Sequence, residues 1–424
     1  MCLIIAGGIG ARQSSAQDGP RQAEAWKIGR PIVTYWAGPA LTDATARQMA
    51  EGGWNMVWCK EQELDVVHRH GLRALLHEPA LLSPRAKSLD DPEKKAKLDV
   101  LIERVRNHPA LYAYYLQDEP NASDFPALGR LVAYLRERDP AHLAYINLFP
   151  TYANNKQLGN EGDTVAAYRE HLNQFVAIVK PDLISYDHYH FCSDGQDGDQ
   201  YFLNLGMIRR AALDAGLPFL NIVQACSWTP KRRVPNGDEL RWLTYTSLAY
   251  GAQGLSHYVY CHPKHVGAMA NADGTTTPLY DAAKSLNREF EAIAAELQPL
   301  RSLGAYHVGM TPPGVEPLPA DAAFRLDPPV APVEFKSLAP VEGFALGFFG
   351  KAEGGGASRA THVVVVNLDY KRGAATAVVG PGALSVFDPS ARTWSPAGGP
   401  HCALDLPPGG GKLLRLEERG DKRE

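Results

Sequence analysis

Short runs of apolar and β-branched residues alternate with longer amphipathic stretches between residues 29 and 303. The runs are typical of strands and lie at 31–36, 55–59, 73–77, 111–117, 143–149, 182–191, 219–225 and 254–260. The stretches between them, such as "TDATARQMAEGG", "SDFPALGRLVAYLRERD" and "DELRWLTYTSLAYGA", are amphipathic with the helical period. A strand followed by a helix, repeated eight times, predicts parallel strands joined by right-handed crossovers.

Residues at the ends of the helical stretches predict where the helices begin and end. Ser123 and Asp238 stand where N-caps are usual, because their side-chain oxygens can accept from free backbone N–H groups. Gly53, Gly71 and Gly216 follow helical stretches, where a left-handed C-cap is common.

The number of strand–helix units favours one architecture. Eight units over residues 29–303 match a (β/α)₈ TIM barrel, which typically takes about 250 residues. An open doubly wound sheet is the alternative, but it usually has a glycine-rich first strand-to-helix turn, and "YWAGPALT" is a poor match. We therefore expect an α/β fold with a (β/α)₈ barrel.

The pattern changes after residue 303. Residues 304–335 are rich in proline and predict a linker or the first part of a second domain. Residues 336–418 contain short apolar runs separated by Gly, Pro and Asp, such as "FALGFFG", "THVVVVNLDY" and "ALSVFD". This texture predicts a small antiparallel, β-sandwich-like C-terminal domain.

Composition and charge narrow the choice of partners. The chain has 424 residues, of which 45% are hydrophobic and 21% charged, as in ordinary soluble globular proteins. A net charge of -4 gives no electrostatic reason to expect a nucleic acid or an anionic membrane as partner. No stretch after the N-terminal leader reaches the roughly 18 apolar residues of a membrane span. We expect no cofactor, no membrane insertion and no obligate protein partner.

The first 28 residues have a different character. "MCLIIAGGIGARQSSAQDGP" has an apolar run followed by small and polar residues, as in the later part of a secretory signal, although the positive n-region is missing. Residues 1–28 therefore predict a signal-like or disordered leader, and a secreted or periplasmic protein, with a cytoplasmic one as the alternative.

One strand ends in two adjacent carboxylates. In "YAYYLQDEPN" an aromatic strand runs into Asp118 and Glu119, and Pro120 ends the ladder because it has no N–H group. Barrel active sites lie at the carboxyl ends of the strands. Two neighbouring carboxylates repel each other and raise one pKa, which favours Glu119 as a proton donor and Asp118 as the group that orients it.

The other strand ends supply carboxylates, aromatic rings, imidazoles and amides. These candidate residues are Tyr35, Trp36, His77, Glu78, Asn147, Asp187, Tyr189, Gln224, Trp228 and Tyr258. A phosphate group would call for cations and backbone N–H nests, and Lys and Arg are scarce here. Flat rings for C–H surfaces, with amides and carboxylates for hydroxyls, fit a neutral glycan.

At this point the sequence resembles a known group. Eight strands, "YLQDEPN" at the end of the fourth and a β-domain behind are similar to the clan A (β/α)₈ glycoside hydrolases, which include cellulases, β-galactosidases and β-glucanases. In that clan a Glu after strand 4, usually preceded by Asn, is the general acid/base, so the resemblance gives this role to Glu119, with Asp118 in place of Asn. The clan's nucleophile, a Glu at the end of strand 7, is replaced here by Gln224.

Three interpretations answer the missing nucleophile. Asp187 could be the second carboxylate, with inversion if it lies about 6.5–9.5 Å from Glu119. The pair Asp118–Glu119 could instead act with a substrate acetamido group, as in some barrel hexosaminidases. The barrel could also bind glycans without cleaving them. We favour a glycosidase that cleaves a neutral β-linked poly- or oligosaccharide, with Glu119 as general acid/base and Asp187 or Asp118 in support.

A metal site is the remaining alternative. His188, His190, Cys192, Cys226, Cys261 and His262 fall at the ends of strands 6, 7 and 8, and zinc sites take His and Cys. Successive strand residues point to opposite faces, however, so "DHYHFC" cannot present all its members to one ion. We expect no metal.

Overall fold

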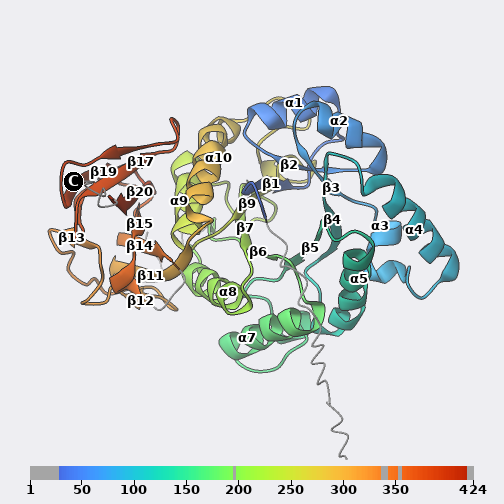
Figure 1. Ribbon diagram of the computed structural model, residues 1–424, viewed down its shortest axis with the longest axis horizontal. Coiled ribbons are helices and arrows are strands. Elements are labelled where there is room, and N and C mark those ends of the chain that lie inside the picture. Colours follow the sequence, from blue (N-terminus) through green and yellow to red (C-terminus); the bar gives the residue numbers. More distant parts are fainter. Residues whose placement is uncertain (1–27, 194–196, 336–341, 352–355, 418–424) are drawn as a thin grey trace, which may run out of the picture.

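The computed structural model describes residues 28–193, 197–335, 342–351 and 356–417. A barrel with surrounding helices is followed by a β-domain that lies beside it (Figure 1). The predicted leader falls, except for Ile28, outside the described residues, so the expectation of export stays a prediction. In the part of the chain that the structure describes, no helix is both long and apolar enough to span a membrane.

The barrel strands and the helices that connect them follow the expected order. The strands are β1 (Ile32–Trp36), β2 (Met56–Cys59), β3 (Arg73–Leu76), β4 (Leu111–Asp118), β5 (Leu143–Leu148), β6 (Ile184–His188), β7 (Phe219–Gln224) and β9 (Gly254–Tyr258). The helices are α1 (Asp43–Glu51), α2 (Leu64–Arg69), α3 (Pro79–Leu82), α4 (Pro92–Val105), α5 (Phe125–Arg138), α6 (Asn155–Leu158), α7 (Thr164–Gln174), α8 (Tyr201–Ala215), α9 (Gly237–Ala249) and α10 (Pro278–Leu297). Two short strands, β8 (Cys226–Ser227) and β10 (Val266–Gly267), pair above the rim.

The predicted barrel is confirmed. All eight long strands are parallel in one sheet of order β1-β9-β7-β6-β5-β4-β3-β2. The two ends of this order meet, because the Val33 N–H donates to Asn55 Oδ1 at 3.0 Å and the Asn55 N–H donates to the Val33 carbonyl at 2.9 Å. The sheet is therefore nearly closed. β6 is shorter than predicted, since its regular pairing ends at His188.

Alternation along each strand decides which side chains fill the barrel. Ile32, Met56, Leu75, Leu183 and Leu220 belong to the cluster inside it. Their strand neighbours point outward and pack against the helices in the larger core. Gly254 leaves room for Leu220, since a Cβ at this glycine would lie 2.7 Å from that side chain. The same alternation directs every second residue of each strand into the barrel. At the carboxyl ends of the strands these inward residues line the mouth.

The helix starts differ from the prediction by two residues. The Asn121 side chain accepts from the Ser123 N–H, and the Asn236 side chain accepts from the Glu239 N–H. The predicted caps Ser123 and Asp238 were therefore wrong: both lie inside the first turn, after an Asn that takes the cap position. The predicted left-handed glycines are confirmed, with φ of +83° at Gly53, +64° at Gly71 and +67° at Gly216.

The C-terminal residues form two sheets. Their strands are β11 (Arg301–Gly309), β12 (Glu316–Pro317), β13 (Arg325–Asp327), β14 (Gly343–Gly350), β15 (His362–Asn367), β16 (Ala374–Val379), β17 (Leu384–Asp388), β18 (Thr393–Pro396), β19 (His401–Leu406) and β20 (Gly411–Leu416). The larger sheet has the order β12-β11-β14-β15-β20-β17-β18 and the smaller β13-β16-β19. All pairings are antiparallel except the short one between β11 and β12, so the predicted character of this domain is confirmed.

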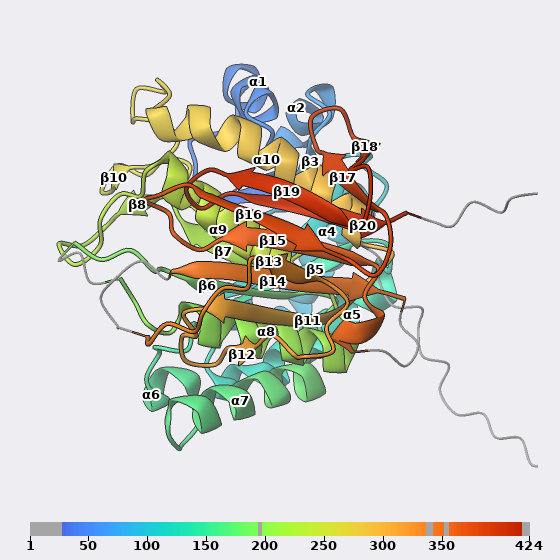
Figure 2. The ribbon, with the colours of Figure 1, turned by 90° about the vertical axis from the view of Figure 1, so that its left-hand side faces the viewer.

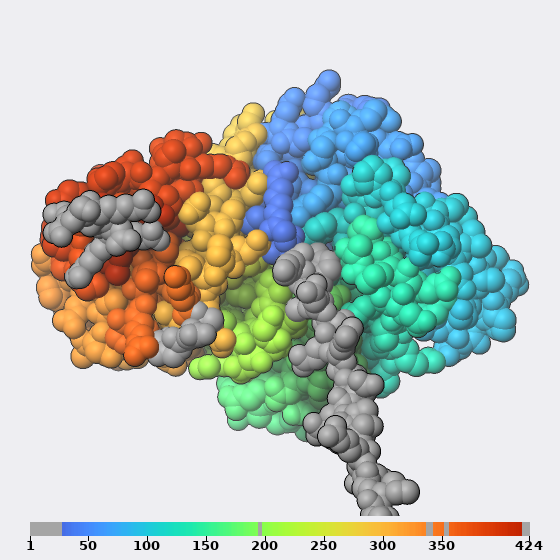
Figure 3. Space-filling model, in the orientation of Figure 1, coloured from blue at the N-terminus to red at the C-terminus, as the bar shows by residue number. Residues whose placement is uncertain are grey.

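The β-domain packs on one helix of the barrel. Figures 1 and 2 show its strands on the α9–α10 side of the barrel, and Figure 3 shows the atoms of the two parts in contact there. Every residue of α9 from Trp242 to Ala249 is buried, because the barrel covers one side of this helix and β14 and β15 cover the other. Its hydroxyl groups are satisfied within the helix, since Thr244, Thr246 and Ser247 each donate to a carbonyl four residues back. Between Trp242 and Ala249 this helix therefore has no solvent-exposed face, in contrast to the amphipathic helix that the sequence predicts.

The backbones of the two parts approach each other closely at Gly347. A Cβ there would lie 2.0 Å from the Ala249 carbonyl oxygen, so Gly347→Ala must push β14 away from α9. We expect it to lower the free energy of unfolding by roughly 1–3 kcal/mol, measured by urea denaturation. Gly382→Ala is the matched control, because a Cβ at that position meets nothing within 4 Å. Equal stability of the two variants would contradict this packing.

Candidate active site

Three neighbouring strands deliver polar side chains to the mouth of the barrel. On β5, Asn147 shares its face with the interior residues Leu143 and Tyr145. On β6, Asp187 follows Leu183 and Ser185 at steps of two. Both Asn147 and Asp187 are therefore directed inward at the carboxyl ends of their strands, where a barrel places its site.

Asn147 connects two carboxylates. Its Nδ2 donates to Asp118 Oδ1 at 3.0 Å and to Asp187 Oδ1 at 2.9 Å. Its Oδ1 accepts from Ser185 Oγ at 3.1 Å, which fixes the orientation of the amide, and Tyr145 lies 2.7 Å from the same hydroxyl. This chain of hydrogen bonds holds Asp118 and Asp187 on opposite sides of one amide.

Glu119 completes the group of carboxylates through an unusual backbone. Its φ is +44°, in the left-handed region, and its N–H donates to the Asn147 carbonyl at 2.8 Å. For a residue other than glycine this conformation costs about 1–2 kcal/mol and is concentrated at functional sites. It brings the Glu119 carboxyl group near that of Asp187, so that the charge of Glu119 raises the pKa of Asp187.

All three carboxyl groups are harder to ionise than usual. Asp118 is partly open to solvent, but the surrounding rim displaces much of its water and raises its pKa to about 6. Burial, followed by the negative charge of Asp118, raises the pKa of Glu119 to about 7. Burial, followed by the charges of Glu119 and Asp118, raises the pKa of Asp187 well above its usual range. Glu119 and Asp187 therefore titrate as a pair that retains a proton near neutral pH.

Two tyrosines lie beside this pair. Burial and then the charge of Asp187 raise the pKa of both Tyr152 and Tyr189, and the Tyr152 hydroxyl accepts from the Tyr189 N–H at 3.4 Å. Asp187 is the most enclosed of the three carboxyl groups, only 3% exposed.

Two groups of aromatic side chains flank the carboxylates. The first aromatic group is Trp36, Trp58, His77 and Tyr115, whose ring centroids lie 4.6–5.7 Å apart. The second aromatic group is Tyr189, Trp228 and Tyr258, with centroids 4.6–5.0 Å apart, and Tyr258 also bonds His265 at 3.1 Å. Such half-buried rings present flat apolar faces with polar edges.

Two of the predicted binding residues do not reach the mouth. Tyr35 is 1% exposed, because it alternates with Trp36 and points outward to pack on Tyr260. Gln224 shares the inward face of Ile222, yet its side chain is fully buried and its amide is bound to backbone groups of Phe191 and Arg233. In this arrangement neither side chain can contact a ligand.

The remaining predicted residues lie at or near the rim. Trp36, His77, Tyr189, Trp228 and Tyr258 are in the aromatic groups. Glu78 is half-buried beside them, where its carboxylate accepts from the Glu61 N–H at 3.5 Å. The site brings these residues around Asn147, Asp118, Glu119 and Asp187, as the strand ends predict.

Four side chains of the site were missed from the sequence. Trp58, Tyr115 and Ser185 lie inside strands, two residues from a strand end or from a predicted residue on the same face. A strict alternation rule applied to each strand would have found them. Tyr152 lies in the long loop after β5, and no local pattern marks it.

The histidines and cysteines of the alternative metal site are dispersed. His188 bonds Asn204 at 2.9 Å, and His190 stacks on Trp242 with centroids 4.8 Å apart. Across the described residues there is no group of three or more His, Cys, Asp or Glu side chains that could hold a metal ion.

Comparison with known proteins finds relatives by structure alone. No family model matches the sequence, and no curated protein sequence matches it significantly. The chain is similar to a glycoside hydrolase of family 5 from Bacteroides vulgatus ATCC 8482, with a TM-score of 0.53 and 10% identity over 92% of this chain and 90% of that chain. A second structure, described as a glycoside hydrolase, has a TM-score of 0.53 and 11% identity over 90% of this chain and 91% of that chain.

A β-galactosidase from the psychrophilic Marinomonas ef1 is 13% identical over 66% of this chain, with a TM-score of 0.45. The chain spans 62% of the length of that protein. At these identities the comparisons show the fold. This is a barrel with a following β-domain of the kind found in glycoside hydrolases.

The charge of Asp118 makes a prediction about pH. Because this charge raises the pKa of Glu119, Asp118→Asn should lower that pKa, and a reaction that needs protonated Glu119 should then lose rate at a lower pH. The alkaline limb of the pH–rate profile, near pH 7 in the wild type, should move toward acid. Glu93→Gln, exposed on α4, is the control and should leave the limb in place. A limb that moves to higher pH in Asp118→Asn would be inconsistent with this arrangement.

Proposed function

We propose that the protein is a glycoside hydrolase in which Glu119 is the general acid/base and Asp187 is the second catalytic carboxylate. One observation carries this proposal: the carboxyl groups of Glu119 and Asp187 lie near each other at the mouth of a barrel, and burial raises the pKa of both. A general acid must hold its proton near neutral pH, and the pKa of about 7 at Glu119 suits that role.

With Asp187 as nucleophile the proposed mechanism is a retaining one. Carboxyl groups about 5–5.5 Å apart retain the anomeric configuration, whereas inversion needs about 6.5–9.5 Å to admit a water molecule. Asp187 lies near enough to Glu119 for the charge of Glu119 to raise its pKa, and this proximity supports the choice of Asp187 as nucleophile.

The proposed reaction needs the proton on Glu119 and the negative charge on Asp187. Asn147 donates to Asp187 at 2.9 Å, which favours the ionised form of Asp187 against burial and the charges of Glu119 and Asp118. The charge of Asp118 also favours the protonated form of Glu119.

The reaction then follows in two balanced steps. Glu119 gives its proton to the glycosidic oxygen while an Asp187 oxygen attacks the anomeric carbon, so the leaving alcohol departs and a glycosyl ester forms. Glu119, now ionised, takes a proton from water as that water attacks the same carbon, and Asp187 is released. Both carboxyl groups return to their starting states.

The substrate class we propose is a neutral β-linked poly- or oligosaccharide. The two aromatic groups supply flat faces on either side of the carboxylates, and Asn147 and the tyrosine hydroxyls can meet sugar hydroxyls. The β-linkage comes from the resemblance to clan A. In this proposal the acid/base follows β4, as in that clan, and the nucleophile comes from β6. The clan has its nucleophile on β7, where this chain has Gln224, whose amide is bound to backbone groups.

Loss of either carboxylate should abolish hydrolysis. Glu119→Gln should lower kcat/KM by about 10²–10⁴-fold, and Asp187→Asn by at least as much, since a transition-state proton donor or the nucleophile is removed. The measurement is reducing-end release from β-glucans, galactans, xylans and chitooligosaccharides, with Glu93→Gln as the surface control. Glycan binding without hydrolysis by the wild type would show instead a barrel that holds glycans and does not cut them.

The anomeric outcome tests the role of Asp187 separately. Proton NMR of the first product should show the β-anomer from a β-linked substrate, because a glycosyl ester formed on Asp187 reverses the configuration twice. Formation of the α-anomer would contradict Asp187 as nucleophile. Retention confined to N-acetylated substrates would favour the Asp118–Glu119 pair acting with the substrate acetamido group.

A further inference from the structure

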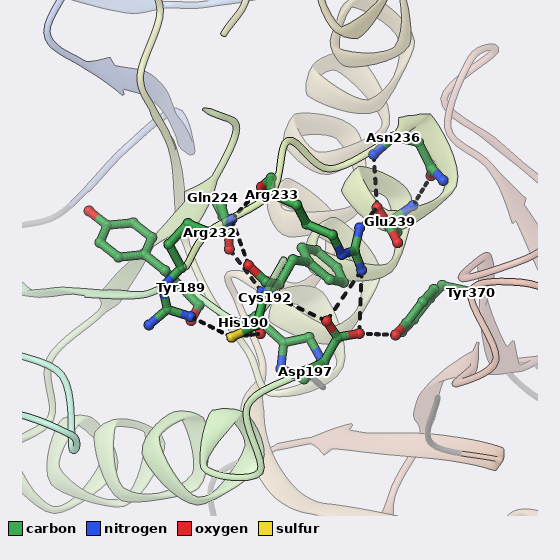
Figure 4. A network of polar contacts seen from close by, with 11 residues as sticks. Tyr189, His190, Cys192, Asp197, Gln224, Arg232, Arg233, Asn236, Glu239 and Tyr370 are labelled. Carbon is green, nitrogen blue, oxygen red and sulfur yellow. Dashed lines mark hydrogen bonds and ion pairs between the residues drawn. The ribbon is translucent and has the colours of Figure 1, made fainter. Parts of the chain in front are cut away.

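The loop after β6 carries Tyr189, a side chain of the site, and is held by the segment that follows β7. Tyr189 is the first residue after β6, and an antiparallel bridge between Cys192 and Arg232 pairs the loop with that segment further along. Side chains from the following barrel segment bind the loop backbone: Arg232 Nη1 donates to the Tyr189 carbonyl at 2.6 Å, and Gln224 bonds both the N–H and the carbonyl of Phe191 at 2.9 and 3.0 Å. The position of Tyr189 thus depends on partners outside its own strand (Figure 4).

Asp197 is the centre of this network. Its side chain is 9% exposed and accepts from the Cys192 N–H at 3.2 Å and from Arg233 Nη2 at 3.3 and 3.4 Å. The other end of Arg233 pairs with the buried carboxylate of Glu239 at 2.7 Å. A buried carboxylate needs such donors, because an unpaired charge away from water is costly. The donors of Asp197 therefore determine the shape of the loop.

One of these donors comes from the other domain. Tyr370 follows β15 of the β-domain, and its hydroxyl donates to Asp197 Oδ2. The Tyr370 ring is 3% exposed and packs edge-on against Phe191, with centroids 5.5 Å apart. Figure 4 shows Tyr370 reaching from the β-domain to the carboxylate of Asp197. The β-domain therefore contacts the same loop that carries Tyr189.

We propose that Tyr370 is a positioning residue for the active site. Through Asp197 it fixes the loop after β6, and that loop carries Tyr189, whose ring packs against Trp228 and Tyr258 in the second aromatic group. The catalytic part of this inference rests on the proposed function; the positioning of the loop does not. The β-domain then has a defined role, which is to complete the mouth of the barrel from outside.

The consequence for the reaction has a definite sign. The proposed function gives the second aromatic group to the sugar, so a displaced Tyr189 ring should weaken substrate binding. Tyr370→Phe should raise KM about 3–10-fold with a smaller change in kcat. The ring contact with Phe191 is kept in this variant.

The experiment compares two changes at the junction of the domains. Tyr370→Phe removes the bond to Asp197, whereas Glu296→Ala removes the bond that Trp394 Nε1 donates to Glu296 at 3.0 Å, between β18 and α10. Hydrogen exchange of the Phe191 and Cys192 amides, kcat and KM are measured for both variants beside the wild type. We expect faster exchange and a higher KM in Tyr370→Phe, and neither change in Glu296→Ala.

The outcomes separate this inference from the proposed function. Unchanged exchange in Tyr370→Phe, or the same changes in both variants, would overturn the positioning role. If the wild type cleaves no glycan, the proposed function fails. Faster exchange limited to Tyr370→Phe would still establish that the β-domain holds the loop.

Discussion

A carboxyl group enclosed at the base of a barrel mouth must be compensated, and much of the site follows from that need at Asp187. Its Oδ1 accepts from the Asn147 amide, and its carboxyl group lies near that of Glu119, whose charge raises the Asp187 pKa. The Asn147 amide depends on a further partner, because Ser185 orients it. The need to satisfy one buried group thus links residues at the ends of three strands.

Alternation along strands makes much of this arrangement predictable. It places Asn147 and Asp187 inward from the sequence alone, and eight strand–helix units already imply a barrel whose carboxyl ends meet. The same rule allows only one of Tyr35 and Trp36 to face the interior, and the structure selects Trp36, so choosing both was more than the pattern supports. The strand-4 motif marks Glu119, but the left-handed backbone that turns it toward Asp187 has no signal in the residue type.

Other features depend on long-range contacts. Gln224 lies on the inward face, and only the fold of the loop after β6 shows that its amide is occupied by Phe191 and Arg233. α9 lacks the pattern of a surface helix for a similar reason, since a second domain covers its outer side. The short strand β13 of the β-domain is set by a partner distant in the chain, since Arg325 pairs with Val379. Local propensity cannot supply such a partner.

The placement of α9 between two layers has a consequence for how the molecule comes apart. This helix belongs to the barrel through β7 and α10 and to the β-domain through β14 and β15, with the Gly347 backbone seated on it. Removing either layer would leave a helix of apolar and hydroxyl side chains facing water. The residue pattern of the sequence changes near residue 300. The packing does not divide there, because α9 contributes to the cores of both parts. The two parts should melt as a single cooperative unit, and neither is a module that can be exchanged without redesigning α9.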